Sequence, residues 1–304
     1  MLRYILKRLL TSIITLFFVI TITFFLMQLV PGNPFQDDKT TPEIEAKMMA
    51  RYGYDRPVVE QYVRYMAGVF QGNFGYSLKV AKGKPITEIF VERMPVSLRI
   101  GFMALCIAMI LGVPLGAAAA VKHDSLFDRC FLFFASFFVS IPSFITTVVL
   151  MLIFGLWLKI LPIAYLEDWT GYIMPVGAMA LGTLFGTARL TRTSMLDVLG
   201  QDYMRTAKAK GLPNGKIIFK HGLRNGVLPV VTTLGPTIAG ILTGSLVIEK
   251  VFGIKGIGQF FTNSVASRDY PLIMATTMLF AALLIFCNFL VDVAYCLIDP
   301  RIKL

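Results

Sequence analysis

Hydrophobic residues occupy this chain in six long uncharged stretches, separated by polar segments. About 20 apolar residues in a helix cross the roughly 30 Å hydrocarbon core of a bilayer. Backbone polar groups within lipid must be paired inside the segment, which favours helices. The pattern therefore predicts an all-α integral membrane protein with six transmembrane helices. The predicted spans are residues 9–30, 100–121, 130–158, 169–188, 225–248 and 270–291.

The third stretch is the longest and contains Pro142. A proline inside a helix removes one backbone hydrogen bond and clashes with the preceding turn. We therefore expect a kink or a tilt at this position.

Lys and Arg are distributed unevenly between the polar segments. With the N-terminus placed inside, the predicted inner segments contain fifteen basic and five acidic residues, whereas the short outer segments are balanced. An excess of basic residues marks the cytoplasmic side, so both termini are predicted to be cytoplasmic. The whole chain is 56% hydrophobic and 15% charged, with a net charge of +11. This orientation explains the positive charge without nucleic acid.

The long outer segment from 31 to 97 is rich in aliphatic and aromatic residues, which opposes disorder. A turn at 31–34 should end the first span, and turn and cap residues predict helices from Pro42 to Gly53 and from Pro57 to Phe70. A third short helix is expected at 85–93. The segment is predicted to be a helical external cap between helices 1 and 2. We expect two domains, 1–94 and 95–297, with a cytoplasmic loop at 189–228 inside the second.

The polar segment between the fourth and fifth spans predicts a short helix. Asp202 is a suitable N-cap, Gly211 suits the left-handed residue after a helix, and Pro213 opposes continuation. A helix this short is marginal alone in water. Met204, Ala207 and Gly211 form a small apolar stripe, while Arg205, Lys208 and Lys210 point elsewhere. The residues permit two interpretations, docking to a cytoplasmic protein or contact with anionic lipid.

Catalytic patterns are missing from the sequence. It contains no GxxxxGK[ST] phosphate loop, no GxSxG and no HExxH. The histidines His123 and His221 have no carboxylate or cysteine at metal-ligand spacing in our interpretation, and the four cysteines form no CxxC pair. We therefore expect no catalytic, cofactor-binding or metal-binding residue. The six stretches also lack the buried charges that mark ion or proton paths.

Small residues are frequent in the fourth and fifth predicted spans. Such residues let membrane helices approach closely, but they also leave room for a translocation path. The sequence does not separate the two alternatives, and the substrate path stays unassigned.

Several motifs resemble the permeases of bacterial ABC importers. The segments 203–212 and 219–225 look like the EAA loop of that family, with Arg205-Thr206-Ala207 in the Glu-Ala-Ala place and Gly211 at the glycine. The arginine, and Leu223-Arg224 where Leu-Pro is usual, look like the first permease of dipeptide, oligopeptide and nickel importers. The motifs at 1–8, 29–34, 72–77, 140–144, 244–252, 268–271 and 299–301 agree with that group. Lys255 stands where the group frequently has proline.

The resemblance implies a type I importer permease that forms half of a path together with a second permease subunit. Two ATPase subunits, which bind ATP and Mg, would dock on the 202–213 loop, and an external binding protein would deliver peptide. The chain itself would need no cofactor. The implied coupling residues are Tyr203, Met204, Arg205, Thr206, Ala207, Lys208 and Gly211.

The sequence features permit three functions, which they favour to different degrees. The first is a permease subunit of an ABC importer in the bacterial cytoplasmic membrane, for peptides or alternatively for nickel or another small solute. The second is a carrier or channel that works without an ATPase, which the missing buried charges oppose. The third is a membrane enzyme or assembly factor, which the missing catalytic residues oppose.

Overall fold

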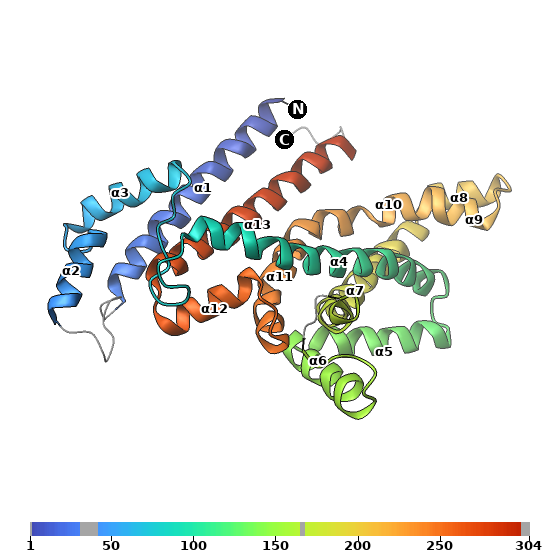
Figure 1. The fold of residues 1–304 in the computed structure, drawn as a ribbon. Coiled ribbons are helices and arrows are strands. Elements are labelled where there is room, and N and C mark those ends of the chain that lie inside the picture. Colours follow the sequence, from blue (N-terminus) through green and yellow to red (C-terminus); the bar gives the residue numbers. More distant parts are fainter. Residues whose placement is uncertain (1, 31–41, 165–167, 299–304) are drawn as a thin grey trace. The chain divides into compact units, whose positions relative to one another are not determined.

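The computed structural model describes residues 2–30, 42–164 and 168–298. All secondary-structure elements in these ranges are helices (Figure 1). The described residues form two compact units. The N-terminal unit contains residues 2–97 and 255–285, and the central unit contains 98–254 and 286–298. The boundary predicted between residues 94 and 95 falls inside helix α4 (Ile86–Val121).

Four helices of the described residues are long and apolar enough to cross a membrane, and two bent helix pairs would raise the number to six if each pair is one span. The four are α1 (Leu2–Leu29), α4, α7 (Thr170–Leu199) and α13 (Tyr270–Ile298). An all-helical membrane protein is therefore confirmed, and the count of six stays a prediction.

The N-terminal unit contains α1 and the two short helices predicted after it. α2 (Pro42–Tyr52) ends at Gly53, which has a φ of 74°, and α3 (Val58–Phe70) begins after its N-cap, Pro57. Both predicted helices are confirmed. The turn predicted at 31–34 lies outside the described residues.

The prediction of a third short helix at 85–93 is wrong, because α4 continues without interruption to Val121. Pro95 lies just after the predicted end of this helix. The buried positions nevertheless keep the helical period through this point, at Ile89, Ser97, Ile100 and Ala104. Burial along this stripe outweighs the local cost of the proline. In the N-terminal unit, Ile86, Ile89 and Phe90 pack with Ile257 and Leu272.

The third predicted span is broken at Pro142, as the proline suggested. α5 (Leu126–Ser140) ends there, and α6 (Ser143–Leu150) continues into the π-helix η1 (Met151–Trp157). The two segments meet at 104°, so they are not one tilted helix.

The remaining helices differ from prediction mainly at their ends. α7 continues to Leu199, beyond the predicted end at 188, so the first part of the polar segment is helical. α11 (Leu228–Phe252) ends at Gly253, which has a φ of 69°. α12 (Ile257–Ser267) was not predicted and precedes α13.

Candidate functional site

The short cytoplasmic helix predicted from the sequence is α8 (Asp202–Ala209). Its N-cap is Gln201, which has an extended backbone and whose carbonyl accepts from the Met204 amide at 3.0 Å. The Gln201 side chain donates back to the Asp197 carbonyl and does not cap the helix. The prediction of Asp202 as N-cap is therefore wrong by one residue. Asp202 begins the helix, where a carboxylate favours the positive end of the helix dipole.

The other end of α8 depends on Gly211, as predicted. Gly211 has a φ of 72°, and its amide donates to the Lys208 carbonyl at 2.9 Å. The Leu212 amide donates to the Ala207 carbonyl at 3.4 Å. These two bonds form a Schellman motif, which satisfies carbonyls at the helix end. Pro213 does not stop α8, because α8 has already ended; it is the N-cap of α9 (Asn214–Lys216).

One side of α8 is buried by the chain itself. Met204 is 0% exposed and Ala207 is 7% exposed, and both pack with Ile217. Leu212 and Leu199 cover the same cluster. The predicted apolar stripe therefore holds the short helix on its own protein, and Ala207 does not lie on the exposed surface.

The outward side of α8 is polar and positively charged. Tyr203, Arg205, Thr206 and Lys208 are all exposed. The Tyr203 hydroxyl accepts from the Asn225 side-chain amide at 2.9 Å, which ties α8 to the chain that follows. Within the described part of the chain, the ion pair of Arg205 is a long and exposed one with Asp202, at 3.7 Å. Such a pair contributes little, so the guanidinium can engage another group.

The segment after α8 returns to the membrane region as the π-helix η2 (Ile217–Leu223) and α10 (Arg224–Gly226). A Cβ added at Gly226 would lie 2.5 Å from the Met195 sulfur on α7. The polar segment therefore packs closely onto α7 at this glycine.

The turn before α5 is organised by a buried ion pair. Arg192 donates from Nε to Asp128 at 2.5 Å and from a terminal nitrogen at 2.6 Å. Asp128 is 1% exposed, and a carboxylate this buried requires such pairing.

His123 and Asp124 lie beside Asp128, close enough for three ligand atoms to approach one ion. The expectation that no carboxylate lies within ligand reach of His123 was wrong. Both Asp128 oxygens are engaged by Arg192, however, which leaves only the exposed pair.

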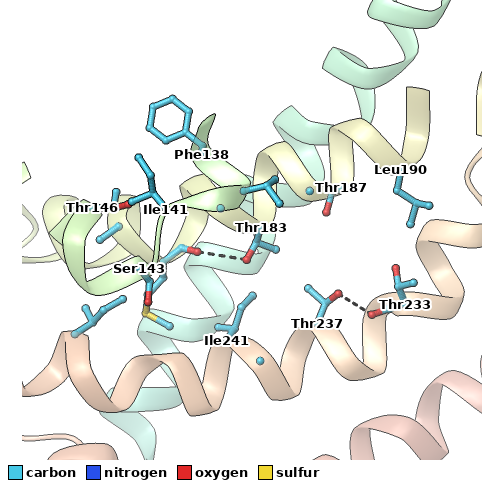
Figure 2. A pocket seen from close by; sticks show the side chains of 17 residues that line it. Phe138, Ile141, Ser143, Thr146, Thr183, Thr187, Leu190, Thr233, Thr237 and Ile241 are labelled. Atoms are coloured by element: carbon cyan, nitrogen blue, oxygen red, sulfur yellow. Dashed lines mark hydrogen bonds between the residues drawn. The ribbon is translucent and has the colours of Figure 1, made fainter. Parts of the chain in front are cut away.

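A cavity of about 480 Å³ lies in the central unit, between α6, α7 and α11 at the end of α5 (Figure 2). The described residues that line it are all uncharged. Gly182, Gly186 and Gly240 contribute to its wall. Six hydroxyl residues also line it, Ser143, Thr146, Thr183, Thr187, Thr233 and Thr237.

Small residues are found both at the cavity and at a helix contact. Gly182, Gly186 and Gly240 line the cavity, whereas Gly112 on α4 packs against α7, where an added Cβ would lie 2.8 Å from the Leu184 carbonyl oxygen. Within the apolar stretches, the hydroxyl residues gave no signal in the sequence. Only the packing of three helices brings them to one wall.

A second group missed by the sequence surrounds Asp269, which precedes α13. Its buried carboxylate accepts from the Ser77 hydroxyl at 2.6 Å and from the amides of Leu78, Lys79 and Val80 at 3.0–3.1 Å. In the sequence, Asp269 stands in the motif 268–271 and among the balanced charges of an outer segment, and neither pattern indicates a bond to Ser77. Residues about 190 positions apart are joined here within the N-terminal unit, and no local pattern indicates that.

Comparison with known proteins identifies the family. Residues 112–304 match the model of the binding-protein-dependent transport system inner membrane component, and residues 1–101 match the N-terminal model of such membrane components. The chain therefore belongs to the family of binding-protein-dependent transport system inner membrane components. The resemblance stated from the motifs is confirmed, and the chain is a multi-pass protein of the bacterial cytoplasmic membrane.

Relatives match over their whole length. The dipeptide transport system permease protein DppB of Bacillus subtilis is 43% identical over 305 residues, covering 100% of this chain and 99% of the relative. The oligopeptide transport system permease proteins OppB of Haemophilus influenzae and of Escherichia coli K12 are each 41% identical over 309 residues, covering 100% of both chains.

Proposed function

We propose that this chain is a permease subunit of an ATP-driven importer, and that it forms half of the path by which peptides cross the cytoplasmic membrane. The observation that carries the proposal is the full-length similarity to permeases named for dipeptide and oligopeptide transport. The reported relatives are named for peptides, so the nickel alternative is not favoured.

Energy would come from partner subunits. The sequence has no phosphate loop, so ATP and Mg would be bound by two ATPase subunits rather than by this chain. A second permease subunit would complete the path, and an external binding protein would deliver the peptide to the outer loops. The basic polar segments support an orientation with both termini in the cytoplasm.

The outward side of α8 is the proposed docking surface for an ATPase subunit. Met204 and Ala207 anchor the helix from behind, while Tyr203, Arg205 and Lys208 are exposed. Because α8 is packed against its own chain, a movement of the docked ATPase subunit can be transmitted through it to the rest of the permease, which a frayed helix could not do. Contact with anionic lipid is the competing interpretation, since the same side is positively charged.

The test reverses the charge of this surface. In the complex with its partner subunits, Arg205→Glu with Lys208→Glu should reduce ATPase co-purification and peptide uptake at least about tenfold, a loss of about 1.4 kcal/mol. Insertion of the chain should not change, because both side chains are exposed. Arg129→Glu, which reverses an exposed basic charge on α5, is the matched control.

Undiminished co-purification and uptake in the double variant would refute docking through α8. Peptide transport by this chain alone in liposomes without ATP would instead favour a carrier. Ala207→Glu is less informative, because it buries a charge and tests only the folding of the helix.

A further inference from the structure

The cavity of the central unit has a wall that matches the main chain of a peptide. Its volume of about 480 Å³ falls within the roughly 300–1,000 Å³ of small-ligand sites. Each residue of a peptide presents one amide donor and one carbonyl acceptor, whatever its side chain. A wall that recognises any peptide must therefore offer both acceptors and donors.

The hydroxyls on α11 supply acceptors. Thr233 donates to the Val230 carbonyl at 3.0 Å, and Thr237 donates to the Thr233 carbonyl at 2.7 Å. A hydroxyl has one proton and two lone pairs. Because each proton is already used within the helix, the oxygen atoms remain as acceptors for amide groups in the cavity.

Three hydroxyls on α6 and α7 supply donors, whereas the Thr183 hydroxyl donates to the Met179 carbonyl within α7. Among the described residues, the side-chain hydroxyls of Ser143, Thr146 and Thr187 make no hydrogen bond within the chain. Thr146 and Thr187 are more than nine-tenths buried, and both line the cavity. Figure 2 shows the Thr187 hydroxyl directed toward the helix that carries Thr233 and Thr237. Each of these hydroxyls therefore keeps a proton that a peptide carbonyl in the cavity could accept.

The described residues that line the cavity are all uncharged, so this wall neither attracts nor repels a charged peptide side chain by formal charge. Building on the proposed function, we propose that the hydroxyl wall of Ser143, Thr146, Thr187, Thr233 and Thr237 binds the main-chain amide groups of the passing peptide. Side-chain identity is then read elsewhere in the importer.

The test uses the complete importer in liposomes, with peptides first shown to saturate the binding protein. Thr187→Val and Thr237→Val each keep the side-chain shape and remove the hydroxyl. Each should lower the maximal uptake rate of tri-alanine about three- to tenfold, the range for one lost hydrogen bond. Peptides with lysine or glutamate side chains should show the same factor. Thr187→Ser should restore uptake, and Thr193→Val, at an exposed position of α7, should have no effect.

Steric filling gives an independent readout. A Cβ at Gly186 meets no atom within 4 Å, so Gly186→Leu should project into the cavity and abolish uptake without lowering the melting temperature. Gly177 on the same helix also has open space but does not line the cavity, so Gly177→Leu is the control.

Three results would overturn the hydroxyl wall. They are unchanged uptake in both valine variants, a loss that depends on side-chain charge, and normal uptake by Gly186→Leu. In each case wild-type uptake driven by ATP would leave the proposed function intact. No ATP-dependent peptide uptake by the wild-type importer would instead refute the proposed function itself.

Discussion

Removing the Asp269 carboxylate should release the loop that follows α3 from the start of α13. The carboxylate is fully buried and accepts from the Ser77 hydroxyl and three consecutive amides, of Leu78, Lys79 and Val80. A hydrogen bond to a charged group contributes about 1.5–3 kcal/mol, and the four bonds share one acceptor and are not additive. We expect Asp269→Ala to cost about 3–5 kcal/mol, because it leaves the buried hydroxyl and the three amides without their acceptor.

Graded substitutions test the reasoning. Asp269→Asn keeps one acceptor oxygen but turns an amide group toward amide donors, so its cost should lie between those of Ala and wild type. Ser77→Ala removes only the hydroxyl and should cost about 1 kcal/mol or slightly more. The expected order of destabilisation is Asp269→Ala, then Asp269→Asn, then Ser77→Ala.

Two measurements apply to the purified complex. Melting in detergent gives the order of stability, and hydrogen exchange gives the local effect, with faster exchange expected at the amides of residues 78–80. Asp55→Ala removes an exposed carboxylate of the same unit and is the control. The claim that Asp269 holds the loop after α3 is refuted if Asp269→Ala melts at the same temperature as Asp55→Ala and the amides of residues 78–80 keep their protection.

Two further outcomes follow from packing and burial. Gly116→Ala should destabilise the central unit strongly, because the added Cβ would overlap the Ala188 carbonyl oxygen, whereas Gly177→Ala has open space; comparison of melting temperatures checks this, and equal temperatures would contradict it. Burial raises the pKa of Tyr65 to about 12, so the folded form favours the neutral phenol. The stabilisation is complete below pH 10 and is lost as the pH rises from 10 to 12. Tyr65→Phe should flatten this alkaline loss in a melting series, whereas Tyr76→Phe at an exposed position should not.

The helices of the N-terminal unit illustrate what local patterns can predict. Gly53 and Pro57 mark the end of α2 and the start of α3 because their backbone angles restrict the chain whatever surrounds them. The helix end predicted at residue 93 was wrong. A stripe of buried residues stabilises α4 as a continuous helix that includes Pro95. Local signals predict an end only where no long-range packing opposes them.

The short helix α8 shows the same division. Gly211 determined where it ends, since its left-handed backbone is local chemistry. Its N-cap lies one residue earlier than predicted, because Gln201 has the extended backbone of an N-cap and its carbonyl accepts from the Met204 amide. Which side faces outward was decided by Ile217 and Leu212, which cover Met204 and Ala207. An apolar stripe predicts burial, but it does not say whether a partner or the chain itself provides the cover.

Membrane spans, charge asymmetry and loop motifs each lie in a continuous stretch of residues. The class of this protein can therefore be predicted without its tertiary structure. The family membership follows from the same stretches. The hydroxyl wall of the central unit and the hydrogen bonds of Asp269 in the N-terminal unit, by contrast, form only when the chain folds. Their residues are neutral hydroxyls or a lone carboxylate, far apart in the chain, and they gain a chemical role only when helix packing removes water and brings them together.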